Sequence, residues 1–429
     1  MSVAAAPSVV RPAARLRGTL ELPGDKSIAH RALIVGALSG GPSSVTVRAP
    51  GADVRSTAAG LRALGVSLDE RADGASVHFT IAGRPSRNAT VDCGNSGTTM
   101  RLLAGAMAGL PLRVTLDGDD SIRTRPMERV ASLLRAMGAE VTTTDGHAPL
   151  TVVGRSRLTA AAHHLPVASA QLLGATVLAG LAAGGETTIS SPGPTRDHTE
   201  RMLVAAGIDV RRDGSVTTVQ GPARPAPLNV AVPGDVSSAA PWLVAAARHP
   251  DAEVTITDVG LNPTRIALVD VLRRAGAEVE ATVLHVRAGE PVGDIRARGG
   301  GQLEPVAIAG TDAAALIDEL PLLGVLMAAA GGELRDASEL RVKESDRIAA
   351  MVAGLDAIGA SVEERPGGWR VTPGSPRDAA IATHGDHRVA IAFTVAALTG
   401  VAASVALDDP DCVGVSYPTF WSDLAEVAS

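Results

Sequence analysis

The sequence predicts an α/β protein of two domains, each made of three βαβαββ repeats. Small polar residues open Ala- and Gly-rich hydrophobic helices at intervals of 68 to 75 residues, and a strand-like segment follows each helix. A second helix then ends at a glycine before another strand, which is a usual helix stop. Repeats of this length exceed those of the common solenoids, so we expect three of them in each globular domain.

The repeats can be followed along the chain. The first helices open at Ser27, Thr98, Ser169, Ser237, Asp312 and Asp386. The strands that follow them are expected at 43–50, 112–120, 185–192, 252–259, 332–338 and 402–409. The second helices stop at Gly65, Gly138, Gly207, Gly276 and Gly359. The sixth repeat is too short at the C-terminus, so we expect residues 1–26 to complete it.

The domain boundaries follow from this grouping. A chain of 429 residues is too long for one ordinary core. We expect one domain over 24–234 and a second over 235–429 together with 1–23. The chain is expected to pass between the two domains at two Pro-Gly pairs, 23–24 and 233–234, and each pair is followed by Asp-x-Ser. Because Pro-Gly is a turn signal, we expect a hinge near 23–24 and 233–234.

Composition narrows the possible functions and compartments. The net charge of −7 argues against nucleic acid as the partner, and the hydrophobic runs are too short to span a membrane. Cys93 and Cys412 are far apart and show no metal or redox spacing, which favours a reducing cytoplasm. Residues 1–17 lack a secretory hydrophobic core, and we expect a frayed start there.

The most informative segment is Pro-Gly-Asp-Lys-Ser at 23–27, which leads into a helix. Only two of the 39 basic residues are lysines, Lys26 and Lys343, which suggests that these positions need a compact ammonium rather than a planar guanidinium. A glycine-bearing turn before a helix offers backbone N–H groups to an anion. Ser27 and Arg31 lie on one face of this helix. An ordinary capped helix remains the alternative for this segment alone.

Further helix starts in the first half carry polar side chains. The segment Asp-Cys-Gly-Asn-Ser-Gly-Thr at 92–98 predicts a second anion seat, in which Gly97 lets a ligand approach the backbone. Arg125 precedes another helix, and Ser169 and Gln171 open the next. Arg196 lies at the start of the helix after that. A plain loop with ordinary N-caps or solvated arginines explains each of these equally well in isolation.

In the second half, Asp318 lies in a hydrophobic segment that we expect to be a helix interrupted by Pro321. An acid there is either at a solvated edge or functional. Lys343 and Arg347 are spaced to share a helix face, with Glu344 about a quarter-turn away, although a salt-bridged amphipathic helix has the same pattern. Arg388 follows Gly-Asp-His at the start of the last long helix.

Taken together, these motifs resemble those of the 5-enolpyruvylshikimate-3-phosphate (EPSP) synthase family. The resemblance rests on PGDKS with Arg31, GNSGTTMRLL, Arg125-Pro126, SAQ at 169–171, TRDHTE at 195–200, LRVKESDR at 340–347 and GDHR at 385–388. It covers nearly the whole chain in the family's order. It implies the enolpyruvyl transferase fold, an inverse α/β barrel in each of two domains that close on their substrates, in agreement with the repeats.

The resemblance also implies a reaction and a set of roles. The family transfers the enolpyruvyl group of phosphoenolpyruvate to the 5-hydroxyl of shikimate 3-phosphate, with release of phosphate and with no metal or organic cofactor. The two substrates are the expected partners of a monomeric chain. The matching catalytic residues are Asp318, Glu344 and Lys26. Those for shikimate 3-phosphate are Lys26, Ser27, Arg31, Ser169, Gln171, Arg196, Asp318 and Lys343, and those for phosphoenolpyruvate are Lys26, Gly97, Arg125, Gln171, Arg347 and Arg388.

Two departures and two alternatives accompany this interpretation. Ala170 stands where one branch of the family has a second serine, and Val415 where some members carry a lysine. A related enolpyruvyl transferase acts on UDP-N-acetylglucosamine, but it uses a cysteine on a loop that corresponds to 113–125, where this chain has none. A non-catalytic binding protein on the same repeats would have no reason to keep Lys26, Asp318, Lys343 and Glu344 together.

Overall fold

The computed structural model describes residues 7–428 and divides the chain into two compact units. The first unit comprises Gly24–Val232 and Val286–Glu290, and the second comprises the remaining described residues. The chain therefore passes between the units after Pro23, Val232, His285 and Glu290. The crossings at 285 and 290 enclose the tip of a β-hairpin, for which the sequence gives no signal.

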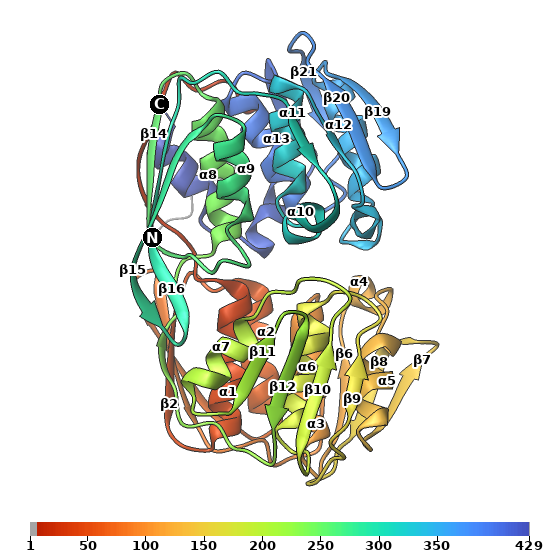
Figure 1. The fold of residues 1–429 in the computed structure, drawn as a ribbon. Coiled ribbons are helices and arrows are strands. Elements are labelled where there is room, and N and C mark those ends of the chain that lie inside the picture. Colours follow the sequence, from red (N-terminus) through yellow and green to blue (C-terminus); the bar gives the residue numbers. More distant parts are fainter. Residues whose placement is uncertain (1–6, 429) are drawn as a thin grey trace. The chain divides into compact units, whose positions relative to one another are not determined.

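The first unit holds three repeats (Figure 1). Its leading helices are α1 (Lys26–Ser39), α3 (Gly97–Ala108) and α6 (Ala170–Gly180), and its other helices are α2 (Ala52–Ala63), α4 (Asp120–Arg123), α5 (Glu128–Ala136) and α7 (His198–Ala205). Its strands are β2 (Ser43–Arg48), β3 (Ser67–Asp73), β4 (Ser76–Ala82), β5 (Ala89–Asp92), β6 (Arg113–Asp117), β7 (Glu140–Thr144), β8 (His147–Val153), β9 (Ala162–His164), β10 (Glu186–Ser190), β11 (Val210–Asp213), β12 (Val216–Gln220) and β13 (Asn229–Ala231).

The second unit repeats this order. Its helices are α8 (Val236–Arg248), α9 (Ala267–Arg274), α10 (Gly310–Ala315), α11 (Leu320–Ala330), α12 (Arg347–Ala357), α13 (His387–Leu398) and α14 (Phe420–Val427), with 3₁₀ turns at Ser338–Val342 and Pro410–Val415. Its strands are β1 (Leu16–Glu21), β14 (Ala252–Gly260), β15 (Glu278–Arg287), β16 (Glu290–Arg298), β17 (Val306–Ile308), β18 (Gly332–Leu334), β19 (Ser361–Arg365), β20 (Gly368–Thr372), β21 (Asp378–Ile381) and β22 (Ser404–Leu407).

Among the described residues, five of the six sheets have four strands and the same topology. In the first unit the strand orders are β13-β2-β4-β3, β5-β6-β8-β7 and β9-β10-β12-β11. The first pair of each sheet is parallel and the remaining pairs are antiparallel. The six strands predicted after the leading helices are all present. The five predicted glycine stops all have φ between 81° and 101°, which confirms their role as helix ends.

The N-terminal segment closes the second unit. Strand β1 pairs in parallel with β14, as β13 pairs with β2 in the first unit, so the N-terminus occupies the place of the last strand of the sixth repeat. The expectation of a frayed start is wrong for part of residues 7–17, because Val10 bridges Val405. Residues 1–6 lie outside the described chain. The sixth repeat has no hairpin among its described residues, since the sheet of β21 and β22 has two strands.

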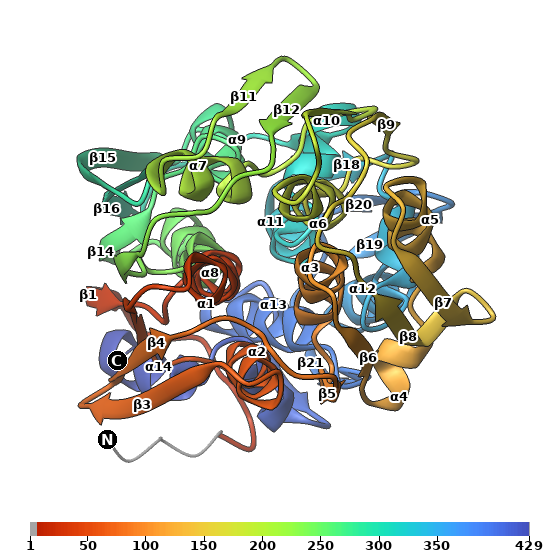
Figure 2. The ribbon, with the colours of Figure 1, turned by 90° about the horizontal axis from the view of Figure 1, so that it is seen from below.

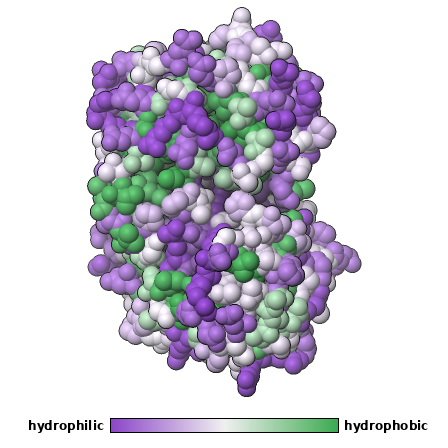
Figure 3. Space-filling model, in the orientation of Figure 1, coloured by the Kyte–Doolittle hydropathy of each residue, from purple (hydrophilic) through white to green (hydrophobic). Residues whose placement is uncertain are grey.

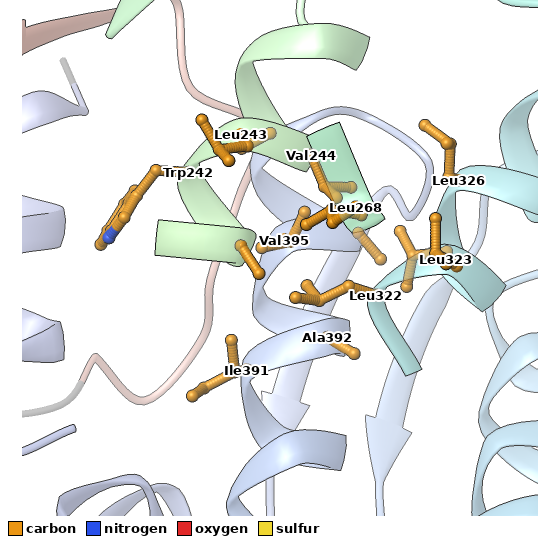
Figure 4. Packing of buried hydrophobic residues seen from close by; sticks show 14 of the residues in the cluster. Trp242, Leu243, Val244, Leu268, Leu322, Leu323, Leu326, Ile391, Ala392 and Val395 are labelled. Atoms are coloured by element: carbon orange, nitrogen blue, oxygen red, sulfur yellow. The ribbon is translucent and has the colours of Figure 1, made fainter. Parts of the chain in front are cut away.

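The leading helices are buried on almost every side because sheets and neighbouring helices surround them (Figures 1 and 2). In the second unit, side chains of α8, α9, α11 and α13 fill the core, including Trp242, Leu268, Leu323 and Val395 (Figure 4). Burial all round explains their Ala- and Gly-rich composition, since small residues let helices approach closely. The polar residues in the first turns of these helices are therefore the ones available to bind a ligand.

The surface is mainly polar on the face shown in Figure 3, with smaller hydrophobic areas between. Within residues 7–428, no helix combines the length and hydrophobicity needed to span a bilayer.

Candidate active site in two half-sites

The predicted site residues fall into two groups, one in each unit. The first half-site lies at the starts of helices in the first unit, and it contains Lys26, Ser27, Arg31, Gly97, Arg125, Ser169, Gln171 and Arg196. The second half-site lies in the second unit, and it contains Asp318, Lys343, Glu344, Arg347 and Arg388.

Lys26 begins α1, after Asp25 caps the helix by accepting a hydrogen bond from the Ile28 amide at 2.9 Å. The Lys26 Nζ donates to Asp53 Oδ2 at 3.0 Å. Burial disfavours the ionised form of Asp53, but the charge and hydrogen bond of Lys26, together with His30 and Arg125, outweigh it and lower the pKa of this carboxyl. Lys26 is therefore an ammonium held in place by Asp53 of α2. Sequence reasoning did not identify this carboxylate partner.

Arg31 joins three helix starts. Its Nε donates to Thr199 Oγ1 at 2.7 Å on α7, its Nη1 to the Ser27 carbonyl at 2.9 Å and its Nη2 to the Ala170 carbonyl at 3.5 Å on α6. Burial lowers the pKa of Arg31 to about 10, so the guanidinium remains charged at neutral pH. Arg196 is close enough to contribute to this shift. Two cations thus gather in a poorly hydrated place, which favours an anion between them.

Gly97 and Arg125 lie together at the start of α3. A Cβ added at Gly97 would lie 2.7 Å from Arg101 Nη1 and 3.4 Å from Arg125 Nη1. Arg125 Nη2 donates to Asn95 Oδ1 at 2.8 Å, and Ser96 caps the helix through the Thr99 amide. The predicted anion seat on this loop therefore has a guanidinium beside the first turn of α3.

Gln171 is held by two groups from α3. Arg101 Nη1 donates to Gln171 Oε1 at 2.6 Å, and Gln171 Nε2 donates to Thr98 Oγ1 at 2.9 Å. Burial lowers the pKa of Arg101 to about 10. Sequence reasoning missed Arg101, although its position four residues after Gly97 places it on the same helix face. Ser169 acts as the N-cap of α6.

A buried polar chain links α1, α2 and α3. The Thr57 hydroxyl is 2.6 Å from His30 Nδ1 and 2.7 Å from Thr99 Oγ1, which in turn is 2.8 Å from Ser96 Oγ. Burial lowers the pKa of His30 to about 3, so this imidazole is neutral at neutral pH. Hydrogen bonds between side chains thereby fix the helix starts of the first half-site relative to one another.

Arg347 is the centre of the second half-site. Its Nε donates to Asp386 Oδ2 at 2.7 Å and its Nη2 to Glu344 Oε2 at 2.5 Å. Burial opposes its charge, but Glu344, Asp386 and Asp318 outweigh burial and raise the pKa of the guanidinium. Its buried Nη1 has no hydrogen-bond partner among the described residues, and Asp318 Oδ1 is 4.0 Å away. This leaves one donor for an incoming acceptor.

The structure corrects two local predictions in this half-site. Pro321 does not interrupt a helix: α10 ends at Ala315, Asp318 lies in the turn that follows, and Pro321 stands in the first turn of α11, where its missing N–H costs little. Lys343 and Glu344 do not share a helix with Arg347, because Asp346 caps α12 and the helix begins at Arg347 itself. The turn still brings Glu344 to Arg347.

Arg388 is the second residue of α13. The N-cap of this helix is Asp386, whose Oδ1 accepts from the Arg388 amide at 2.9 Å and whose Oδ2 accepts from Ser345 Oγ at 3.0 Å. Asp386 therefore places Arg347 and Arg388 at one helix start, a role that sequence reasoning missed. Val415, where some members of the resembling family carry a lysine, ends the 3₁₀ turn at Pro410–Val415.

Glu200 gives the first half-site a pH-dependent group. Burial raises its pKa to about 7 from its ordinary 4.5, despite an ion pair with Arg212 at 3.3 Å. The folded chain therefore holds this proton at pH values where the unfolded chain has released it. The stability that Glu200 contributes is complete below about pH 4.5 and is lost as the pH rises through about 7.

We expect Glu200→Gln to remove this dependence, because the amide is neutral at every pH. The free energies of unfolding of both proteins are measured with urea at pH 5 and pH 8. Relative to the parent, the free energy of unfolding of the variant should rise by roughly 3 kcal/mol between pH 5 and pH 8. Glu186→Gln, at an exposed ion pair with Arg211, is the control and should show little change. A stability difference that is the same at both pH values would contradict the prediction.

Comparison with known proteins gives consistent matches over nearly the whole chain. The family model described as EPSP synthase (3-phosphoshikimate 1-carboxyvinyltransferase) matches residues 10–424. A 3-phosphoshikimate 1-carboxyvinyltransferase of Gloeobacter violaceus is 47% identical over 427 residues, which cover 97% of this chain and 98% of the relative. One of Acidithiobacillus ferrooxidans is 46% identical over 417 residues, 96% and 95% of the two chains. The solved EPSP synthase of Acinetobacter baumannii is 35% identical with a TM-score of 0.86, and 98% of each chain is covered.

Proposed function

The chain belongs to the EPSP synthase family, and from this membership we propose how its residues carry out the family's reaction. The protein is a transferase, a 3-phosphoshikimate 1-carboxyvinyltransferase, in the shikimate pathway of aromatic amino-acid biosynthesis. It transfers the enolpyruvyl group of phosphoenolpyruvate to the 5-hydroxyl of shikimate 3-phosphate and releases phosphate. The alternative acceptor UDP-N-acetylglucosamine finds no support in these relatives.

The observation that carries the proposal is the gathering of buried cations at helix starts. Each substrate bears a carboxylate and a phosphate, and an ionised phosphate carries about −1.5 to −2 charges. Arg31 is buried and Arg101 is partly buried, and burial lowers the pKa of each to about 10, so both remain charged with reduced hydration. Anionic substrates replace that hydration.

We assign the substrates to the half-sites by residue. In the first half-site, Lys26, Ser27, Arg31, Ser169, Gln171 and Arg196 hold shikimate 3-phosphate. Lys343 and Asp318 of the second half-site complete this set. Phosphoenolpyruvate is held by Lys26, Gly97, Arg125 and Gln171 of the first half-site and by Arg347 and Arg388 of the second. Support comes from the Arg31 and Arg101 contacts, and from the donor of Arg347 that has no partner among residues 7–428.

The chemistry is acid–base catalysis of addition and then elimination. Asp318 accepts the proton of the 5-hydroxyl as its oxygen bonds to C2 of phosphoenolpyruvate, while Glu344 donates a proton to the methylene carbon, which gives a tetrahedral intermediate. Glu344 then takes a proton back from that carbon as the bond between C2 and the phosphate oxygen breaks and phosphate leaves. Lys26 assists as a proton-exchanging cation. Arg347 donates a hydrogen bond to Glu344 and lies 4.0 Å from Asp318, so it helps to position both acids. No cofactor or metal enters these steps as we propose them.

We further propose that the two units close on the substrates about hinges near 23–24 and 233–234. Support comes from the assignment itself, because each substrate requires residues of both units. The enzyme works as a cytoplasmic monomer in this proposal, and shikimate 3-phosphate and phosphoenolpyruvate are its partners.

The test of the function is phosphate release by the purified enzyme. Phosphoenolpyruvate is supplied with shikimate 3-phosphate, with UDP-N-acetylglucosamine or with no acceptor. We expect phosphate to be released only with shikimate 3-phosphate. A folded protein that releases none with this acceptor, or that prefers the sugar nucleotide, would overturn the proposal.

The contacts of Gly97 predict the response to glyphosate, an inhibitor that in this family occupies the phosphoenolpyruvate site. The parent enzyme should be sensitive, and inhibition should be competitive with phosphoenolpyruvate. In Gly97→Ala the new methyl points at Arg101 and Arg125, so the longer inhibitor should lose more affinity than the shorter substrate. Because Arg101 also holds Gln171, the affinity for phosphoenolpyruvate should fall to a smaller extent.

Inhibition constants for both proteins at matched phosphoenolpyruvate saturation check this prediction. Gly74→Ala is the control, because Gly74 lies in an open turn and has no neighbour within 4 Å. Gly105→Ala is unsuitable, because its Cβ would overlap the Ala175 backbone. Equal inhibition constants for the parent and Gly97→Ala would place Gly97 outside the site.

A further inference from the structure

The hairpin of β15 and β16 ends in a tip that belongs to the first unit. Ala288 and Gly289 connect the strands, with φ values of 48° and 82°. Positive φ at both central residues is the geometry of a type I′ turn, and it is demanding for alanine. The body of β15 is exposed at Val283, Leu284 and Val286. Glu290, by contrast, is 1% exposed, so the tip packs against the first unit.

The tip is fastened to the first turn of α7 at two points. His198 Nδ1 is 2.8 Å from Glu290 Oε1, and each side chain is 1% exposed. A carboxylate only accepts hydrogen bonds, so the imidazole donates. Arg201 Nη1 donates to the Gly289 carbonyl at 3.2 Å, and a Cβ on Gly289 would lie 2.7 Å from the Arg201 carbonyl. Only glycine allows this approach of two backbones.

The same helix turn also faces the substrate side. Thr199, next to His198, accepts from Arg31 Nε at 2.7 Å. Arg201 forms an ion pair with Asp197 at 2.9 Å, in the segment that carries Arg196. Glu290 is among the charges that act on Arg31, with Arg196 and Glu200. A shift of His198 would therefore move the groups that position both arginines.

We propose that Glu290 is a positioning residue for shikimate 3-phosphate: the hairpin tip holds α7 through His198 and Arg201, and thereby sets Arg196 and Arg31 for the phosphate. This inference rests on the proposed assignment of those two arginines. His198 Nε2 has no hydrogen-bond partner within residues 7–428, so Glu290 provides the hydrogen bond that fixes this buried ring.

Two independent variants test the proposal. Glu290→Asp keeps the charge but withdraws the carboxylate from His198, and its control is Glu280→Asp, the same change at an exposed position of the same hairpin. Gly289→Ala pushes the tip away from Arg201. Its control is Gly214→Ala, another glycine with positive φ, at 56°, which has no neighbour within 4 Å. Glu290→Gln keeps the length and an accepting oxygen, and should restore the parent behaviour.

The readouts are calorimetric binding of shikimate 3-phosphate alone and steady-state kinetics. We expect Glu290→Asp and Gly289→Ala to raise the Kd and the KM for shikimate 3-phosphate at least about fivefold, on the order expected for one hydrogen bond. The kcat and the KM for phosphoenolpyruvate should stay within about twofold of the parent, as should all constants of the controls and of Glu290→Gln.

Folded variants that bind shikimate 3-phosphate like the parent would overturn the positioning role. Equal losses for both substrates would also overturn it, because they would indicate a merely structural contact. A parent enzyme without affinity for shikimate 3-phosphate would overturn the proposed function and this inference together. The two failures are therefore distinguishable.

Discussion

The Asp318→Asn variant is expected to bind both substrates and to turn over at least about a hundredfold more slowly, within the range that a positioned acid or base contributes. The amide keeps an oxygen that can accept hydrogen bonds, but it cannot take the proton of the 5-hydroxyl. Asp318 lies in a turn 4.0 Å from Arg347, where the substitution removes no helix cap. A loss confined to the transition state lowers kcat and kcat/KM equally.

Steady-state kinetics with each substrate varied in turn, together with direct binding of shikimate 3-phosphate, check this result. Asp312→Asn is the matched control, because Asp312 lies on neighbouring α10 and forms an exposed ion pair with Arg274. It should leave kcat unchanged. If the affinity of Asp318→Asn for shikimate 3-phosphate collapses while kcat is preserved, Asp318 binds substrate and is not the base.

The sequence predicts most of the fold because its repeats mark every level of structure. Helix starts and the strands after them recur six times and glycine stops five times, so an error in one repeat is corrected by the others. The hairpin tip at 286–290 could not be predicted in this way. Its place depends on the Glu290 contact with His198, which joins residues 92 positions apart and has no periodic signature.

The candidate site could be predicted at the level of residue type and helix start, but not at the level of partners. Lys26 is conspicuous because lysine is rare in this chain, whereas its partner Asp53 is one acid among many. Arg101 and Asp386 act from the interior, on Gln171 and Arg347, and local sequence does not reveal burial of that kind. The turn that contains Asp318 could not be predicted, because a proline such as Pro321 is compatible both with a helix break and with the first turn of a new helix.

The Lys26→Arg variant is expected to fold normally and to lose at least about a hundredfold in turnover, although the formal charge is unchanged. Lys26 Nζ is 3.0 Å from Asp53, and its side chain is one-third exposed (33%) at the start of α1. A guanidinium at this position would form a two-pronged pair with Asp53, which draws the charge away from the substrates. It would also remain protonated, so it could not exchange a proton as an ammonium can.

Turnover of Lys26→Arg is compared with that of Arg17→Lys, which makes the reverse exchange at the exposed ion pair with Asp251 and should leave the rate unchanged. Asp53→Asn and the double variant Lys26→Arg/Asp53→Asn complete a thermodynamic cycle. If capture by Asp53 contributes to the defect, Asp53→Asn should be less harmful in the arginine background than in the parent. Loss of proton exchange should persist in the double variant, because no partner makes arginine a proton donor at neutral pH. A Lys26→Arg enzyme with a near-normal rate would show that this site requires only a positive charge, and that the rarity of lysine in the chain carries no catalytic meaning.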